Sequence, residues 1–278
     1  MFSRLTWLFC PEDCAYSHLL PPKKSPILPP MIASLKARAK YKLDSVFWWL
    51  VERLVPIHLA PPPQGTVLVV APHPDDETFA CGATIARLNA QRTNIHIVII
   101  SDGSNSTRQE GKTKSALAKI RKTEARGAIQ ALGLPEKQVT FLNYSDGSLE
   151  KAESIIMEEL SHIIEIKKPS LIFAPHAIDA HPDHKILATI IDKLKLPCLC
   201  YRYIVWVQTK RSLANLMKLA FTEHQIRIPM KKFKERKALA IDCYLSQTGG
   251  TNYQHGKGFL HPSFISLFLK EEEVFFTK

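Results

Sequence analysis

Residues 66–77 read TVLVVAPHPDDE, and this stretch decides the fold of the chain. Its first half, Thr66–Ala71, is a short and continuous apolar run. Such a run is typical of a strand that is buried on both faces of a parallel sheet. The second half places histidine and aspartate directly after that strand, at the edge where open α/β sheets bind their ligands.

Outward from this stretch, strand-like and helix-like segments alternate as far as Val207. We expect helices over Glu77–Gln91, Lys114–Leu132, Glu150–Lys167 and Pro182–Leu194, and strands over Thr66–Ala71, Ile95–Ile100, Val139–Leu142, Leu171–Ala174 and Cys198–Val207. This alternation predicts an α/β fold, a Rossmann-like three-layer sandwich whose mostly parallel sheet is covered by helices on both faces.

Residues 1–65 differ from the rest and are expected to form an N-terminal extension to a domain over residues 66–278. Within that domain, residues 66–206 form the predicted core and residues 207–278 a basic C-terminal part. The extension is rich in proline and then carries an amphipathic pattern over Val46–Leu59. We interpret this pattern as a helix packed on the domain; the alternative is peripheral contact with a membrane surface, because lysine and arginine precede it.

The compartment is predicted from cysteine usage and from the length of the apolar runs. The six cysteines show no C-x-x-C spacing, so we expect reduced thiols and a cytoplasmic setting. No apolar run reaches the roughly 18–20 residues that a transmembrane helix needs.

The net charge of +11 is unevenly distributed along the chain. Residues 66–200 contain 16 basic and 16 acidic residues, whereas residues 201–240 contain 10 and 2. The neutral core excludes a generic basic groove as the source of its chemistry, and no nucleic-acid-binding motif accompanies the basic segment, so we expect no nucleic-acid partner. The excess charge instead predicts steering of an anionic sugar substrate or contact with an anionic membrane surface.

Four expected strand ends carry aspartate or histidine, and this concentration is the main functional signal. The stretches are Pro72–Glu77, Ser101–Asn105, Asn143–Gly147 and Pro175–His184. No G-x-G-x-x-G or G-x-x-x-x-G-K motif is present, which disfavours dinucleotide and P-loop nucleotide binding. The side chains on offer are metal ligands instead.

His73 and Asp76 stand three residues apart at an expected helix start, and His184 completes a ligand set if the strand Leu171–Ala174 lies beside Thr66–Ala71. Two imidazoles and a carboxylate suit a catalytic zinc, which keeps one position for water. Iron(II) or another divalent ion is the alternative.

Three further residues beside these ligands have predicted roles. Asp75 is a natural general base, and His181 can stabilise an oxyanion or donate a proton to a leaving amine. Asp183 can hydrogen-bond an active-site histidine and fix its tautomer. Each short motif alone could be a helix cap with acidic residues in the first turn; the capping interpretation weakens because both motifs follow strands.

These residues resemble the zinc-dependent N-acetylglucosaminyl deacetylases related to PIG-L and LmbE. The resemblance covers roughly residues 66–206 and rests on the motifs Ala71–Glu77 and His181–His184. It implies zinc held by His73, Asp76 and His184, with Asp75 as base and His181 as its electrostatic or acid partner. It also implies hydrolysis of an acetamido group on a sugar, and it makes Arg121, Arg108 and Asp102 candidates for binding the substrate.

We therefore expect a metal-dependent hydrolase that removes the acetyl group from an N-acetylated amino sugar in a glycan, glycolipid or sugar conjugate. One alternative is an amidase acting on a larger amino-sugar conjugate. Another is a catalytically inactive basic module that binds anionic lipid or nucleic acid. It is disfavoured because the set of proposed ligands and catalytic residues is intact, namely His73, Asp75, Asp76, His181 and His184.

Overall fold

The structure is a computed structural model that describes residues 46, 49–50, 53–55, 57, 63–105, 112–206, 213–249, 260 and 262–277. All of them belong to the second of two compact units, Ser34–Lys278. Half of the expected helix Val46–Leu59 and the whole proline-rich stretch before it lie outside the described residues; residues 46, 49–50 and 53–54 are described and are helical. The division between residues 65 and 66 stays a prediction.

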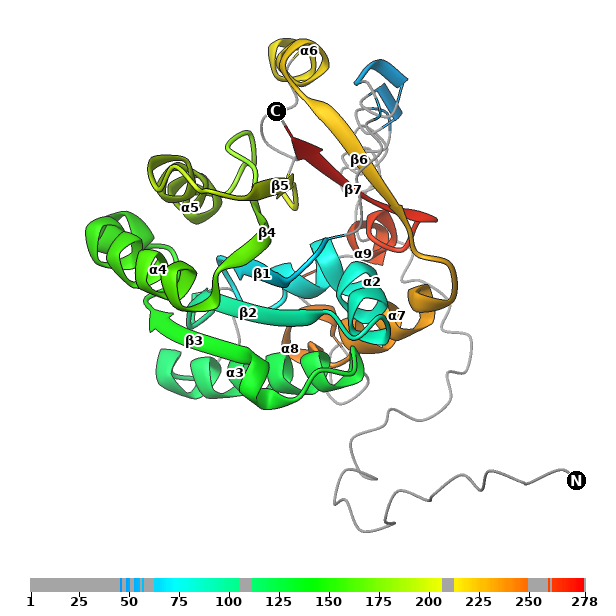
Figure 1. Ribbon diagram of the computed structural model, residues 1–278. Coiled ribbons are helices and arrows are strands. Elements are labelled where there is room, and N and C mark those ends of the chain that lie inside the picture. The colour runs from blue at the N-terminus through cyan, green and yellow to red at the C-terminus, as the bar shows by residue number, and fades with distance from the viewer. Residues whose placement is uncertain are drawn as a thin grey trace, which may run out of the picture. The chain divides into compact units, whose positions relative to one another are not determined.

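The centre of the unit is a seven-stranded sheet with the order β3-β2-β1-β4-β5-β7-β6 (Figure 1). Strands β1 to β5 pair in parallel, and β7 pairs antiparallel with both β5 and β6. The strands are β1 (Thr66–Ala71), β2 (Asn94–Ser101), β3 (Val139–Tyr144), β4 (Pro169–Pro175), β5 (Leu199–Tyr203), β6 (His224–Pro229) and β7 (Glu272–Thr277). The predicted mostly parallel sheet is confirmed.

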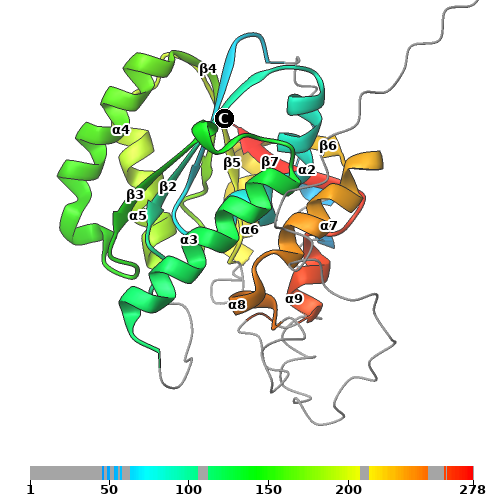
Figure 2. The same ribbon diagram turned by 90° about the horizontal axis from the view of Figure 1, so that it is seen from below.

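Helices cover the sheet on both faces, which is the predicted three-layer arrangement (Figure 2). One layer holds α4 (Glu153–Lys167) and α5 (Pro182–Lys193); the other holds α2 (Asp76–Ala90), α3 (Lys114–Ala131), α7 (Lys234–Asp242) and α9 (Pro262–Leu267). The remaining helices are α6 (Leu213–Thr222) and the short α8 (Leu245–Thr248). None of the helices described is long and apolar enough to cross a bilayer.

Strand β1 supplies both cores because consecutive side chains of a strand point to opposite faces. Val67 and Val69 belong to the core beneath α2 and α3, whereas Leu68 and Val70 belong to the core beneath α4 and α5. All four side chains are fully buried. This explains why the sequence of β1 is continuously apolar rather than alternating.

Strand β4 lies directly beside β1, with Val69 opposite Phe173. His184 could join the two other predicted ligands only if these two strands were neighbours, and they are. Chain order reverses between these two strands, because β2 and β3 lie on one side of β1 and β5 lies beyond β4. The loops that follow β1 and β4 thus meet at the switch point where such sheets bind ligands.

Two features of the C-terminal half differ from the expectation. The fifth strand ends at Tyr203 instead of Val207, because the backbone N–H groups of Val205 and Trp206 donate to the carboxylate of Asp179. The sheet also gains β6 and β7, which the sequence did not predict. Both strands are short and only partly buried, and they are held in the sheet by pairing with each other across more than 40 residues of the chain.

Four of the ten basic residues in the segment 201–240 pair with acidic residues from elsewhere in the fold. Its four ion pairs among the described residues are Arg202–Asp192 (2.6 Å), Arg227–Glu272 (3.7 Å), Lys234–Glu271 (2.7 Å) and Lys237–Glu273 (2.7 Å). Three of the acidic partners are consecutive residues at the start of β7. This pairing weakens the expectation that this segment steers an anionic substrate.

Candidate active site

The loop after β1 starts α2 through a strained aspartate. Asp75 has φ 139° and ψ −28°, a conformation that favours glycine and that costs other residues roughly 1–3 kcal/mol. Its carbonyl oxygen accepts the backbone N–H groups of Thr78 and Phe79 at 3.0 and 2.9 Å, which begins the helix. Strain of this kind persists where surrounding contacts over-determine it, and such places are often functional sites.

The loop after β4 starts α5 with an N-cap. His181 is the cap: its ring Nδ1 accepts the backbone N–H of Asp183 at 3.2 Å, and Pro182 occupies the first helical turn. The capping interpretation is thus correct for His181 and Pro182. It leaves His184 unexplained, because that side chain is fully buried and points at the loop after β1.

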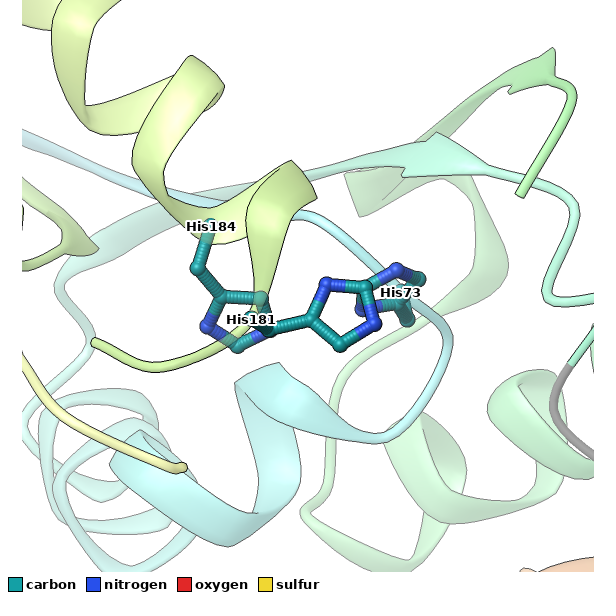
Figure 3. A group of neighbouring side chains, drawn as sticks. All are labelled: His73, His181 and His184. Carbon is teal, nitrogen blue, oxygen red and sulfur yellow. The ribbon is translucent and has the colours of Figure 1, made fainter. Parts of the chain in front are cut away.

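Three of the predicted residues converge between the two loops. Oδ2 of Asp76 lies 3.0 Å from Nδ1 of His73 and 3.0 Å from Nε2 of His184. His181 joins them from the N-terminal end of α5, and the three histidine rings gather as Figure 3 shows, each offering a nitrogen within 4.8 Å of the others. Residues more than 100 positions apart in the chain therefore share one site.

The ring of His184 is oriented by Asp179. Nδ1 of His184 lies 3.1 Å from Oδ2 of Asp179, so in the neutral ring Nδ1 carries the proton and Nε2 presents a lone pair. That Nε2 is fully buried and has no aligned hydrogen-bond partner among the described residues, although Oδ2 of Asp76 is close. A buried imidazole nitrogen without such a partner is available to coordinate a metal ion.

The ring of His73 is oriented in the same way by two other carboxylates. Its Nε2 lies 3.1 Å from Oδ2 of Asp183 and 3.2 Å from Oδ1 of Asp146. Asp183 also accepts the backbone N–H groups of Gly147 and Leu149 at 2.8 and 3.2 Å, so its position is fixed. Asp183 thus lies within hydrogen-bond distance of His73, and its role in fixing a tautomer stays a prediction.

Sequence reasoning missed Asp146 and Asp179. Both stand directly after expected strands, in the stretches that were singled out for their aspartate and histidine content. That location was the available signal. It did not separate a carboxylate that orients a histidine from one that binds metal, because only the distances between loops decide this.

The electrostatics of the cluster favour a cation. Burial opposes protonation of His184, but the carboxylates of Asp179 and Asp76 outweigh it and raise the pKa of His184 to about 9. Burial likewise opposes the charged form of His73, whose pKa is nonetheless raised by its carboxylate neighbours. Burial would raise the pKa of Asp76, yet the two histidines hold it far below its ordinary value. The carboxylate of Asp76 therefore stays ionised between two histidines, and the surrounding carboxylates favour a proton or another cation on these histidines.

Asp75 lies beside this cluster with a different environment. Burial is the largest cause that raises the pKa of Asp75 to about 7; Arg121 opposes the rise, and the charges of Asp76 and Glu77 support it. Nη2 of Arg121 lies 3.1 Å from Oδ2 of Asp75. A buried carboxyl with a pKa near neutrality can both accept and release a proton at physiological pH.

His181 is held in one tautomer and is neutral. Burial, followed by the charges of His73 and His184, lowers the pKa of His181 to about 4. Because Nδ1 accepts the N–H of Asp183, the ring proton resides on Nε2. His181 can therefore donate a hydrogen bond from Nε2 at neutral pH.

The three residues predicted to bind substrate have separate locations. Arg121 is buried, 1% exposed, and its guanidinium donates to Asp75 and to the carbonyl oxygen of Pro74. These contacts are those of a positioning residue for Asp75, and its role with substrate stays a prediction. Oδ1 of Asp102 accepts the backbone N–H groups of Ser104 and Asp146. Arg108 lies outside the described residues.

Comparison with known proteins links the site to one family. A family model described as PIG-L, GlcNAc-PI de-N-acetylase, matches residues 68–195. A Bacillus cereus protein described as probable N-acetyl-alpha-D-glucosaminyl L-malate deacetylase 2 is 32% identical over 125 residues, which are 42% of this chain and 55% of that protein. This chain thus spans about half the length of the curated relatives it matches.

Solved structures share the fold at lower identity. N,N'-diacetylchitobiose deacetylase from Pyrococcus horikoshii superposes with a TM-score of 0.57 at 19% identity and covers 88% of this chain and 92% of its own. GalB, the 4-carboxy-2-hydroxymuconate hydratase from Pseudomonas putida KT2440, superposes with a TM-score of 0.53 at 18% identity over 67% of this chain and 81% of its own. Because a hydratase shares the fold, the fold alone does not determine the reaction.

Proposed function

We propose that the protein, whose residues 68–195 match the family model of the PIG-L de-N-acetylases, is a metal-dependent hydrolase that removes the acetyl group from an N-acetylated amino sugar. The reaction adds water to the acetamide and releases acetate and the free amine. The observation that carries the proposal is the convergence of His73, Asp76 and His184 beside the buried Asp75.

We assign His73, Asp76 and His184 as the residues that hold the metal. The donor set of two imidazoles and one carboxylate is typical of catalytic zinc, which is the ion we propose. The buried Nε2 of His184 and the two histidines oriented by carboxylates support this fit. When bound, a divalent ion supplies Lewis-acid polarisation of the amide carbonyl and of water.

The protein residues around that position can carry the proton transfers. Asp75, with a pKa near 7, accepts a proton from the attacking water and can deliver it to the departing nitrogen. Arg121 and the strained backbone hold this carboxylate in place. Neutral His181 donates a hydrogen bond from Nε2 to the carbonyl oxygen as negative charge develops there.

Release of acetate across a panel of N-acetylated sugars tests the proposal. The panel contains N,N'-diacetylchitobiose, N-acetylglucosaminyl malate, N-acetylglucosamine and N-acetylgalactosamine, each incubated with zinc-loaded protein. We expect acetate and free amine in equal amounts from at least one glucosamine-type member. Acetate production that is unaffected by removing the metal would contradict the metal-dependent mechanism.

The stability of the metal-free protein and the stabilisation that zinc adds should both depend on pH, in opposite directions. The folded pKa of His184, about 9 without metal, exceeds its unfolded value of about 6.5. Its contribution to stability is therefore complete below about pH 6.5 and is lost as the pH rises through 9. The unfolding temperature of metal-free protein should fall over this window, and the increment from added zinc should grow, because zinc replaces the ring proton.

Thermal scans with zinc and with a chelator, taken in steps from about pH 6 to pH 9, measure both quantities. The variant His184→Ala serves as the control, since it lacks one of the proposed ligands and should show no zinc increment at any pH. An increment in the unfolding temperature that stays constant or shrinks with rising pH would show that zinc does not compete with this proton.

A further inference from the structure

A pocket of about 250 Å³ lies next to the loop that carries His73 and Asp75, and its lining comes from that loop, from α3 and from the carboxyl ends of β2 and β3. Pockets that enclose a drug-sized ligand measure roughly 300–1,000 Å³, so this one suits part of a ligand. We call it the α3 pocket; it is lined by Pro74, Ser101, Asp102, Ser115, Ala118, Lys119, Lys122, Phe141 and Asn143.

One face of α3 forms a wall of this pocket. Ser115, Ala118, Lys119 and Lys122 have the i, i+3, i+4, i+7 spacing that places side chains on one side of a helix. The opposite side of α3 is buried and carries Leu117, Arg121, Ala125 and Ala128. The pocket wall is therefore a separate stripe with two ammonium groups, on the N-terminal half of the helix.

The two lysines differ in their surroundings. Lys122 is half-buried; its Nζ donates to Oδ1 of Asn143 at 3.1 Å and lies 4.9 Å from the ring centre of Phe141. Lys119 is exposed and has no ion-pair partner among the described residues. Asn143 itself has a φ of 59°, so Lys122 anchors a residue in the left-handed region at the pocket rim. One ammonium group is thus fixed and the other is available.

The single carboxylate in the lining does not cancel these charges. Oδ1 of Asp102 is occupied by the backbone N–H groups of Ser104 and Asp146, at 3.0 and 3.2 Å. Asp102 thereby joins the pocket wall to the loop that carries Asp146, the neighbour of His73. Two lysines against one engaged carboxylate leave a net positive charge.

The pocket is one residue away from the reacting groups. Pro74, which lines it, stands between the proposed ligand His73 and the proposed base Asp75. The pocket therefore borders the loop that carries the proposed ligand and base, and the part of a substrate that it can accept is a group other than the acetamide. Because the pocket is small and basic, that group should be small and anionic.

We propose that the α3 pocket binds a carboxylate or phosphate carried by the aglycone of the N-acetylated sugar, with Lys119 and Lys122 as its ligands. This inference rests on the proposed function, since it names the substrate class of the same site. Anion binding was expected from the basic segment 201–240, where several basic residues pair with glutamates; the proposal assigns it to α3 instead.

The first test compares substrates that differ in aglycone charge. Full-length protein is assayed on N-acetylglucosaminyl malate, on N-acetylglucosamine 1-phosphate and on neutral methyl N-acetylglucosaminide. Lys119→Gln with Lys122→Gln should lower kcat/KM for one of the anionic substrates by roughly fivefold to tenfold and leave the neutral one within about twofold. The malate and phosphate arms separate the two anion sources.

Lys137→Gln is the matched control, because it removes one exposed positive charge from the opposite end of β3. Equal losses for charged and neutral substrates, or an equal loss in the control, would overturn the pocket assignment.

A second readout does not need catalysis. Binding of L-malate and of inorganic phosphate to the full chain is measured by calorimetry for the wild type, the double lysine variant and Lys137→Gln. Anion binding that only the lysine pair supports, without deacetylation of any sugar, would keep the pocket and reject the proposed function. Deacetylation without anion binding or aglycone discrimination would reject the pocket and keep the function.

Discussion

Asp75→Asn is expected to lower kcat by about 10²–10⁴-fold while the protein keeps its full metal content. Asparagine preserves the shape of the side chain and tolerates a positive φ, so the turn that starts α2 should survive. What is lost is the buried carboxyl, with its pKa near 7, that accepts the proton of water. Steady-state kinetics on the best substrate, with metal analysis of the same preparation, measure both properties.

Asp192→Asn is the matched control for this variant. Its carboxylate is half-exposed and pairs with Arg202 near the C-terminal end of α5, away from the cluster. This variant should keep near wild-type kcat and metal content. Preserved turnover in Asp75→Asn would show that another group is the base, and loss of metal in it would place Asp75 among the ligands instead.

His184→Ala is expected to abolish stable metal binding. The side chain is fully buried, and its Nε2 is one of three donor atoms that converge between the loops after β1 and β4. Removing the residue that orients a ligand typically costs about 10–100-fold in metal affinity, so removing the ligand itself should cost more. Competition with a chromophoric chelator gives the affinity, and the wild type should hold about one divalent ion per chain.

Two further variants make the result specific. Asp179→Asn should fall between the wild type and His184→Ala, because Asp179 orients the ring without binding the metal. His96→Ala removes another buried histidine, which contacts Thr140 rather than the cluster, and should leave the affinity unchanged. If His184→Ala bound zinc as tightly as His96→Ala, the assignment of His184 as a ligand would fail.

Local periodicity was sufficient to predict most of the core elements. The predicted strands over Thr66–Ala71 and Leu171–Ala174 correspond to β1 and β4, and the predicted helix Pro182–Leu194 corresponds to α5. These elements have strong local signals, such as a doubly buried apolar run or a proline in the first turn. β6 and β7 have no such signal, because their stability comes from pairing across more than 40 residues.

Isolated charge counts were less informative than positions at strand ends. The excess of basic residues in 201–240 suggested an anion-binding surface, yet Glu271, Glu272 and Glu273 fold back on three of those residues. The basic residues that line a pocket, Lys119 and Lys122, belong to the segment whose total charge is zero. Net charge along a chain does not report which charges face each other after folding.

The sequence by itself determined the strand–helix alternation and the residue types in the two histidine–aspartate motifs, because both are encoded within a few consecutive positions. Only the tertiary structure decided that β4 lies beside β1, so that His184 meets His73 and Asp76. It alone revealed Asp146 and Asp179 as the carboxylates that orient the histidines, and Arg121 as a buried partner of Asp75. Those roles depend on distances between loops, which strand order fixes and which no local pattern contains.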